Sequence, residues 1–439
     1  MELSKQPYKG ARDFYPPDKR RQDYMFGVMR KTAKKFGYEE YDAPILEPLE
    51  MYIAKSGEEI VNEQTYAFKD RGGRDVAIRP EMTPTVSRMV AAKRQELSYP
   101  LRWFSIPNLW RYERPQRGRL REHWQLNVDL FGISGIEAEL ELIMLAHQLF
   151  LDFNATESMF EIRVNNRQLM NYLFKDYLGL TEAQSYTMAK LIDRKHKMNQ
   201  AAFIGQLDAL FTPSEREEGM TEKLLSVLSA KTIDKLPPEL RESKPAKDLE
   251  QLVISANNQG VRNIIFDVTV VRGFDYYNSI VFELFDTHPD NNRAMMGGGR
   301  YDGLVGLFGV EPVATVGFGM GDATLANFLD LHGLMPELPI ETDIYVAVIG
   351  EVYEPAIKAV SQLRSLGVNA AIDFSGKKLG DQLKTAEKKS FKYVLIIGSQ
   401  EVETEQYTLR DLSQSNESKH SLERIVSIVL DRRSKPELD

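Results

Sequence analysis

The stretch RYERPQRGRLREHWQ, residues 111–125, holds the densest group of side chains that could do chemistry in this sequence. Five arginines fall within eleven residues and are interleaved with acids and amides. A planar guanidinium group matches two oxygens of a phosphate at once, so this composition favours phosphate binding. The alternative is a solvated basic loop, because charge runs are usually solvated.

Two apolar runs flank these arginines and indicate how they are positioned. Residues 100–110 predict a buried strand, and residues 126–133 predict a second one. Two strands joined by this segment would form a hairpin with a cationic tip. Gln125, Asn127 and Asp129 recur at every second position, so we expect them on one face of the second strand, where they would line a polar pocket.

Polar side chains also stand at the ends of other predicted elements. Glu81 and Thr83 lie at a strand-to-helix junction, where Thr83 could simply cap the helix. Arg272 follows an apolar run, Val268–Val271, that predicts a strand. The consecutive glycines at 297–299 permit close approach of the backbone to a ligand. The glycines alone could form a hairpin turn, as Thr83 alone could be a cap, but Arg272 at the end of an apolar run would be poorly placed as a mere surface charge.

Taken together, these segments resemble the histidyl-tRNA synthetases, a family of class II aminoacyl-tRNA synthetases. Residues 111–125 are similar to the class II hairpin that lies over ATP, and RPEMTP at 79–84 is similar to the segment that grips the α-amino group of the amino acid. VRGFDYY at 271–277 and GGGRYDGL at 297–304 resemble the two histidine-specific signatures, in the same order. GYEEYDAPILEP at 37–48 resembles the class II dimer interface, so the resemblance implies a homodimer.

The resemblance implies that the chain couples L-histidine to ATP, giving histidyl-adenylate, and transfers the histidyl group to the 3′ end of tRNA(His). The substrate carboxylate is the nucleophile, so the protein has to position the reactants and neutralise the α-phosphate. Magnesium is expected with ATP, although no metal ligand is assigned.

Residue roles follow from the same resemblance. It assigns catalysis to Arg272, Arg111 and Gln125, and histidine binding to Glu81, Thr83, Gln125, Asp129, Tyr277 and Tyr301. It assigns ATP binding to Arg111, Glu113, Arg114, Arg119 and Arg272. Asp129 and Tyr277 would bind the two imidazole nitrogens, and Asp129 is shorter than the Glu that the family often has at this position.

The run Val313–Leu329 departs from the family. Its glycines imitate a dinucleotide fingerprint, but the βαβ unit is missing and the third glycine comes one position early. It is more similar to the third class II motif, a strand and helix that floor the ATP site. The family usually has Glu and then Arg where this chain has Ala323 and Thr324. An active enzyme would therefore need another basic side chain or a second magnesium ion at the triphosphate.

Length and composition bound the remaining expectations. With 439 residues the chain has room for about two or three domains. The residue patterns predict a helical insertion at about 168–256, a linker at 331–341 and a small α/β domain at 342–439. With these, the resemblance implies an α/β multidomain protein, in which 1–330 is a class II catalytic domain with an antiparallel sheet flanked by helices and 342–439 is the anticodon-binding domain. Basic patches of the last domain, such as Lys377 with Lys378, could be solvated helix faces, but the resemblance to the family's anticodon-binding domain favours RNA contact.

The chemistry of the whole chain excludes several classes. The net charge of −8 argues against general nucleic-acid coating, and the lack of cysteine excludes disulfides and thiolate metal sites. The six histidines are scattered, which disfavours a zinc site. The N-terminal stretch has no apolar signal core, and no run approaches a membrane span, so we expect a cytoplasmic protein without membrane contact.

Three alternatives remain. One is a catalytically inactive paralogue with a regulatory role, which typically lacks the C-terminal domain and the arginine of VRGFDYY, although this sequence has both. Another is a synthetase for a different amino acid: the threonyl type uses a cysteine-containing zinc site, and the prolyl and glycyl types lack the two histidine signatures. The third is a non-enzymatic RNA-binding module, which Thr324 keeps open.

Overall fold

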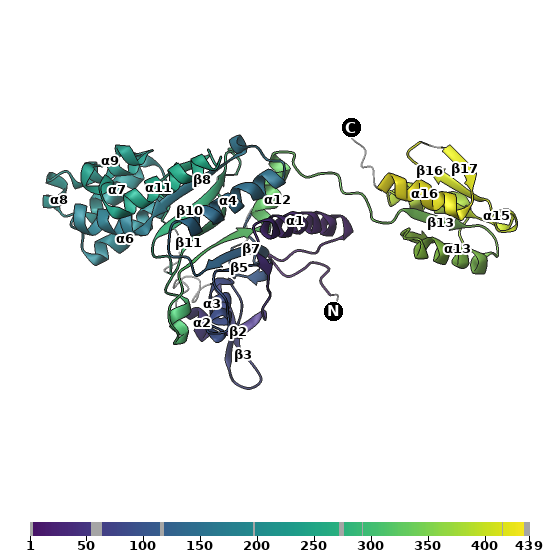
Figure 1. The fold of residues 1–439 in the computed structure, drawn as a ribbon, viewed down its shortest axis with the longest axis horizontal. Helices are drawn as coiled ribbons and strands as arrows, with labels where there is room; N and C mark the ends of the chain where they lie inside the picture. The colour runs from purple at the N-terminus through teal and green to yellow at the C-terminus, as the bar shows by residue number, and fades with distance from the viewer. Residues whose placement is uncertain are drawn as a thin grey trace. The chain divides into compact units, whose positions relative to one another are not determined.

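Two compact units divide the chain, Met1–Pro336 and Glu337–Asp439. Figure 1 shows the ribbon, coloured along the sequence. The computed structural model describes residues 3–53, 64–114, 118–195, 198–271, 276–291, 293–414 and 416–433.

A large sheet organises the first unit. Among the described residues it has nine strands, in the order β1-β5-β7-β12-β11-β10-β8-β9, with β6 paired to β7. Neighbours from β5 to β8 run antiparallel, and only the two edge strands pair in parallel. The expected fold class is confirmed. The strands are β1 Glu39–Glu40, β5 Leu101–Ser105, β6 Asn108–Trp110, β7 Glu122–Phe131, β8 Phe160–Asn166, β9 Ile264–Phe266, β10 Ile280–Asp286, β11 Ala294–Arg300 and β12 Thr315–Gly321.

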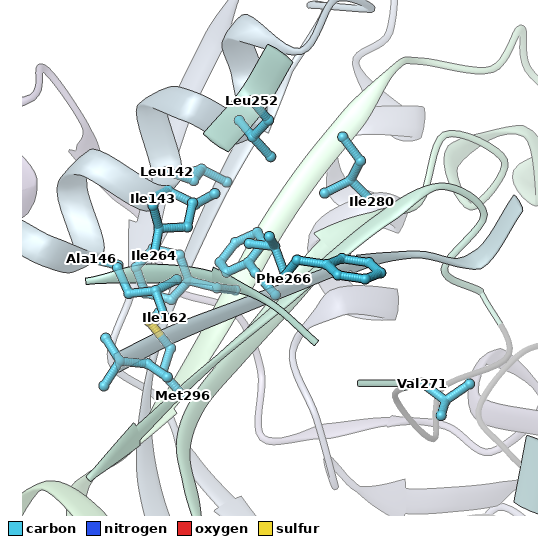
Figure 2. Packing of buried hydrophobic residues seen from close by; sticks show 14 of the residues in the cluster. Leu142, Ile143, Ala146, Ile162, Leu252, Ile264, Phe266, Val271, Ile280 and Met296 are labelled. Carbon is cyan, nitrogen blue, oxygen red and sulfur yellow. The ribbon is translucent and has the colours of Figure 1, made fainter. Parts of the chain in front are cut away.

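Helices α1 (Pro16–Lys35), α4 (Glu137–Asp152) and α12 (Asp322–Leu331) lie along one face of this sheet (Figure 1). Buried residues of α4, among them Leu142 and Ile143, pack against strand residues such as Ile162 (Figure 2). The strands place their other alternating positions on the opposite face, and that face carries the polar residues discussed below.

The strand predicted at residues 100–110 is two strands, β5 and β6. The chain breaks at Pro107, which has no N–H to give to the ladder and whose carbonyl oxygen accepts from Gln125 N at 3.2 Å. Both strands nevertheless pair antiparallel with β7, so the predicted hairpin is confirmed. The arginine-rich segment joins β6 to β7.

The strand predicted at Val268–Val271 is wrong. The structure places β9 earlier and turns the chain at these residues. Asn165 Nδ2 donates to the carbonyl oxygens of Val268 and Val270 at 3.0 Å each, and Asp267 Oδ1 accepts from Thr269 N at 2.9 Å. Side chains thus take the backbone groups that a sheet ladder would have used.

A small sheet and a run of helices complete the first unit. The small sheet has the order β2-β4-β3, with β2 Leu46–Pro48, β3 Tyr66–Lys69 and β4 Asp75–Ile78. Near it lie α2 Glu50–Ile53 and α3 Thr83–Ala92. No helix in the described segments is long and apolar enough to cross a membrane. Between β8 and β9 follow α5 Arg167–Tyr172, a π-helical turn Leu173–Tyr177, α6 Glu182–Asp193, α7 Gln200–Leu210, α8 Pro213–Glu217, α9 Met220–Ser229, α10 Pro238–Arg241 and α11 Lys244–Asn258.

The second unit is a five-stranded sheet with helices, counted over its described residues. Its order is β14-β13-β15-β16-β17, in which the first three strands are parallel and the last two antiparallel. The elements are β13 Ile344–Val348, α13 Tyr353–Ser365, β14 Ala370–Ile372, α14 Leu379–Lys388, β15 Tyr393–Ile397, α15 Ser399–Thr404, β16 Tyr407–Asp411, β17 Asn416–His420 and α16 Leu422–Arg433.

Candidate active site

Four glycines leave part of the polar sheet face without side chains. Gly317 pairs with Asp129 across β12 and β7, and Gly319 pairs with Asn127, so these residues share a face. A Cβ at Gly317 would lie 2.2 Å from Asp129 Oδ1, and one at Gly319 would lie 2.8 Å from Gln125 Cδ. The polar side chains of β7 therefore lean over bare backbone, which only glycine permits. The four residues are Gly297, Gly299, Gly317 and Gly319.

Asp129 and Tyr301 form a buried pair on this glycine floor. The Tyr301 hydroxyl donates a hydrogen bond to Asp129 Oδ1; Tyr301 is 2% exposed and Asp129 is 3% exposed. Burial raises the pKa of Asp129 to about 7, and the hydrogen bond from Tyr301 acts against that rise. Asp129 is thus close to half ionised at neutral pH, which suits recognition of a ring that carries both a donor and an acceptor nitrogen.

A second buried carboxylate, Glu81, lies close by. The hydroxyl of Tyr276 donates to Glu81 Oε2 at 3.0 Å and also contacts the side chain of Thr83. The Tyr276 ring lies 5.7 Å from the ring of Tyr301, centroid to centroid. Met82, rather than Thr83, is the N-cap of α3, so the capping interpretation of Thr83 is wrong.

Tyr276 was not singled out from the sequence. It stands beside Tyr277, whose ring packs instead on the glycine floor. A Cβ at Gly299 would lie only 2.9 Å from Tyr277 Cδ1. The ring centroids of Tyr277 and Tyr301 are 6.4 Å apart. A buried Glu needs a donor, and that requirement is the signal that could have identified Tyr276.

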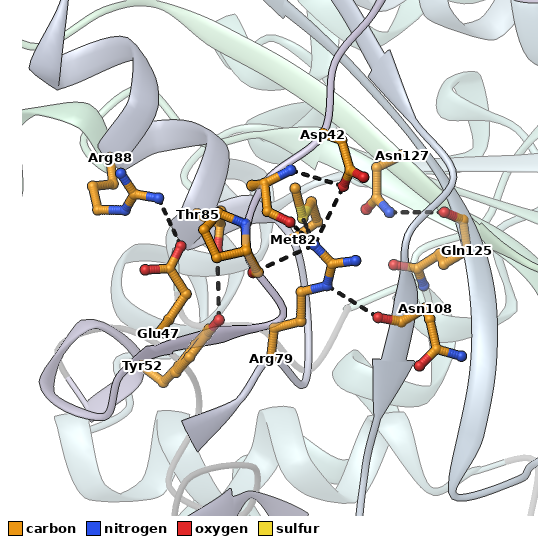
Figure 3. A network of polar contacts seen from close by, with 12 residues as sticks. Asp42, Glu47, Tyr52, Arg79, Met82, Thr85, Arg88, Asn108, Gln125 and Asn127 are labelled. Carbon is orange, nitrogen blue, oxygen red and sulfur yellow. Dashed lines mark hydrogen bonds and ion pairs between the residues drawn. The ribbon is translucent and has the colours of Figure 1, made fainter. Parts of the chain in front are cut away.

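Arg79 fixes the segment that carries Glu81. Its buried guanidinium donates to the carbonyl oxygens of Ala43 at 2.7 Å and Asn108 at 3.0 Å (Figure 3). Arg111 Nε donates to the carbonyl oxygen of Pro80 at 2.8 Å, which ties the arginine-rich segment to the same place. The predicted histidine and ATP residues on these segments therefore come together at one end of β7.

The arginine-rich segment itself holds a buried acid. Arg119 Nε lies 2.5 Å from Glu113 Oε2; the Arg119 side chain is half exposed, and Glu113 is buried. Arg114 is exposed. Two predicted features, Arg272 and the tip at residues 115–117, lie outside the described residues.

The start of α12 closes the same end of β7. Thr324 Oγ1 donates to the carbonyl oxygen of Gly321 at 3.0 Å, and a Cβ at Gly118 would lie 3.4 Å from Thr324 Cγ2. Thr324 therefore lies against the arginine-rich segment. Asp322 is 1% exposed and accepts from Trp124 N at 3.0 Å and from Arg12 at 2.7 Å.

His123 is a further residue that the sequence analysis did not single out. It precedes Gln125 by two positions on β7, so it belongs to the same face. Burial lowers its pKa to about 3, with Arg111, Arg12 and Arg119 adding to the effect. The imidazole is therefore neutral at physiological pH, and three guanidinium groups lie around it.

Comparisons with known proteins show which family this chain resembles. A family model described as histidyl-tRNA synthetase matches residues 10–324, and one described as anticodon binding domain matches residues 343–432. A histidine–tRNA ligase of Leptospira biflexa is 41% identical over 439 residues, 99% of each chain. One of Thermoplasma volcanium is 37% identical over 406 residues, 92% of this chain and 93% of the relative.

Solved structures share the fold. A histidyl-tRNA synthetase from Nostoc sp. PCC 7120 superposes with a TM-score of 0.80 at 21% identity, covering 98% of this chain and 100% of that one. An ATP phosphoribosyltransferase regulatory subunit/histidyl-tRNA synthetase from Bacillus halodurans gives 0.74 at 21% identity, covering 91% and 100%.

Proposed function

The chain belongs to the histidyl-tRNA synthetase family, and we propose that its glycine-floored site carries out both steps of histidine–tRNA ligation. The chain is a class II aminoacyl-tRNA synthetase that acts as a histidine–tRNA ligase and uses ATP. The observation that carries the assignment of the site is the buried Asp129–Tyr301 pair over Gly317.

The imidazole of histidine binds at this pair. Asp129 and Tyr277 take its two ring nitrogens, with Tyr301 orienting Asp129. A ring without nitrogens would leave the buried Asp129 carboxyl with the Tyr301 hydroxyl as its partner but without a partner on the ligand, which costs far more than the removal of one apolar group. The site therefore discriminates by hydrogen bonding rather than by size.

The amino and carboxylate groups of histidine lie toward the other end of β7. Glu81 pairs with the ammonium group, supported by Tyr276, and Thr83 adds a hydroxyl. Gln125 leans over Gly319 and holds the carboxylate. This places the attacking carboxylate oxygen next to the arginines, where charge develops on the phosphate.

ATP binds over the arginine-rich segment. One carboxylate oxygen attacks the α-phosphorus in line, the bond to the bridging oxygen breaks, and pyrophosphate leaves. Arg111 and Arg272 neutralise the α-phosphate, while Glu113, Arg114 and Arg119 bind the rest of the nucleotide. Magnesium enters as part of the MgATP substrate, and no group of three or more potential metal ligands occurs in the described chain.

In the second step a hydroxyl at the 3′ end of tRNA(His) attacks the histidyl carbonyl carbon, and AMP leaves. The C-terminal unit, from about residue 342, binds the tRNA, and the exposed lysines before and along α14 contact phosphates. These lysines are Lys377, Lys378, Lys384, Lys388 and Lys389.

The catalytic domain spans about 1–330, and the helices between β8 and β9 are its insertion.

We also propose a homodimer in the cytoplasm. The segment 37–48, similar to the class II dimer interface, exposes the apolar residues Ile45 and Leu46, which are 51% and 44% exposed. The regulatory alternative is not favoured, because the histidine–tRNA ligases match over the full chain and the C-terminal domain is present.

ATP–pyrophosphate exchange tests the proposal. The purified protein is assayed with MgATP and each amino acid in turn, and exchange is expected with histidine alone. Tight histidine binding by calorimetry, with no exchange at saturating MgATP, would make the protein a histidine sensor instead. Exchange driven by another amino acid would contradict the assignment of Asp129 and Tyr301.

A further inference from the structure

The N-terminal segment lies tightly against the beginning of β7. The carbonyl oxygen of Gly10 accepts from Arg121 N at 2.9 Å and from Glu122 N at 3.2 Å. A Cβ at Gly10 would lie 2.8 Å from Arg121 Cγ, and Gly10 has a φ of +86°. Only glycine fits there, so the segment is held at a fixed position beside the arginine-rich stretch.

This segment places Arg12 beside the start of α12. Arg12 donates to Asp322 Oδ2 at 2.7 Å, and Asp322 Oδ1 accepts from Trp124 N. The guanidinium lies 4.9 Å from the centroid of the Phe14 ring and 5.8 Å from that of Trp124. The Arg12 side chain is still 27% exposed, so the group is oriented but not fully covered.

Arg12 there belongs to a cluster of guanidinium groups. After burial, the charges of Arg111, Arg12 and Arg119 each add to the lowering of the His123 pKa. Two of these arginines also have a carboxylate partner: Asp322 pairs with Arg12, and Glu113 pairs with Arg119. Guanidinium groups near one end of a strand are suited to a polyphosphate, because each offers several N–H donors in a fixed plane.

Position 324 explains why this cluster needs Arg12. Thr324 stands in the first turn of α12, against Gly118 of the arginine-rich segment, and its hydroxyl is used within the fold. It carries no charge. We propose that Arg12 is a nucleotide-binding residue, which supplies to the triphosphate of ATP, from the N-terminal segment, the guanidinium that position 324 lacks. This inference rests on the proposed function.

A purely structural role for Arg12 predicts different behaviour. If Arg12 only joins the N-terminal segment to α12 through its ion pair, its loss would lower stability and change KM for ATP and for histidine to the same extent. The chain offers a matched control in Arg21, which forms an ion pair with Asp330 further along the same helix. Loss of Arg21 removes a comparable ion pair, between α1 and α12, and leaves the guanidinium cluster unchanged.

Steady-state pyrophosphate exchange with the full chain separates the two roles. Arg12→Ala is expected to raise KM for ATP by roughly 10- to 100-fold, the factor carried by one charge-assisted hydrogen bond, with KM for histidine within about twofold of wild type. Arg21→Ala should leave both KM values near wild type. Adding Thr324→Arg to Arg12→Ala should lower KM for ATP again, because the cation returns from the neighbouring position.

Several results would overturn the inference. These are an unchanged KM for ATP in Arg12→Ala, an equal rise for ATP and histidine, or no recovery in the double variant. If Arg12→Ala does not fold, Arg12→Gln keeps a donor for Asp322 and removes the charge, and a wild-type KM for ATP in that variant contradicts the inference. Absence of histidine-dependent exchange in the wild-type protein would instead refute the proposed function.

Discussion

The hydroxyl of Tyr301 donates its hydrogen bond to Asp129 directly over the bare backbone of Gly317. The pair links a strand before the helical insertion to the segment after it, so 172 positions separate the two residues in sequence. Because both residues are buried, a change in the protonation of Asp129 affects the stability of the protein. Under the proposed function it also affects the recognition of histidine.

Asp129 makes the stability of the ligand-free protein pH dependent. Its pKa is about 7 in the folded protein, against 3.8 for an unperturbed aspartate, so between these values the folded state binds more protons than the unfolded one. The contribution of Asp129 is therefore fully present below about pH 4 and is lost as pH rises through about 7. The total loss is on the order of 4 kcal/mol.

Urea unfolding of wild type and Asp129→Asn at pH 5 and pH 8 measures this contribution. The neutral amide does not titrate, so the free energy of unfolding of the variant should rise relative to that of wild type as pH rises. The comparison is made without histidine, whose own imidazole titrates in this range. An identical pH dependence in the two proteins would show that Asp129 is ionised throughout.

Removal of the Tyr301 hydroxyl should weaken histidine recognition. Tyr301→Phe keeps the ring and leaves Asp129 buried without its donor, which costs about 1–3 kcal/mol for an unsatisfied group. We expect kcat/KM for histidine in pyrophosphate exchange to fall by about 10- to 100-fold, with KM for ATP little changed. Tyr24→Phe, on α1, is the control for loss of a tyrosine hydroxyl, and an equal effect in both variants would contradict the role of Tyr301.

The central sheet could be predicted because its polar residues alternate along one strand. Gln125, Asn127 and Asp129 recur at period two, and the structure places them on one face beside the glycine floor. The hairpin followed from the apolar runs on each side of the arginines. The hydrophobic pattern of residues 100–110 favoured a single strand, but Pro107 divides it into two. The reason is that proline has no N–H to donate to the sheet.

Other features depend on contacts that the local pattern does not contain. The turn after β9 forms because Asn165, about a hundred positions earlier, takes two of its carbonyl oxygens. The edge strand β17 is polar and exposed at nearly every position, so it carries no alternation signal. Tyr276, Arg12 and His123 acquire their neighbours only when distant segments meet, which is why sequence reasoning passed over them.

A methyl group at Gly317 should abolish histidine binding. In Gly317→Ala the new Cβ would lie 2.2 Å from Asp129 Oδ1 and 3.0 Å from the Tyr301 hydroxyl, so the pair must move. Calorimetry should detect no histidine binding at concentrations that saturate wild type. Gly303→Ala is the matched control, because no atom lies within 4 Å of its added Cβ, and it should bind histidine normally. Normal binding by Gly317→Ala would place the histidine site elsewhere.

Removal of the C-terminal unit should separate the two reaction steps. A chain that ends at Pro339 keeps the whole first compact unit, so histidine-dependent pyrophosphate exchange should remain near wild type. Aminoacylation of tRNA(His) should fall because the lysines of the second unit no longer reach phosphates. The slope of log affinity for tRNA against log salt should become shallower by about 0.7–0.9 for each phosphate that a lysine no longer neutralises. If tRNA affinity and its salt dependence are unchanged, these lysines do not bind tRNA, and the insertion or the catalytic unit carries the binding instead.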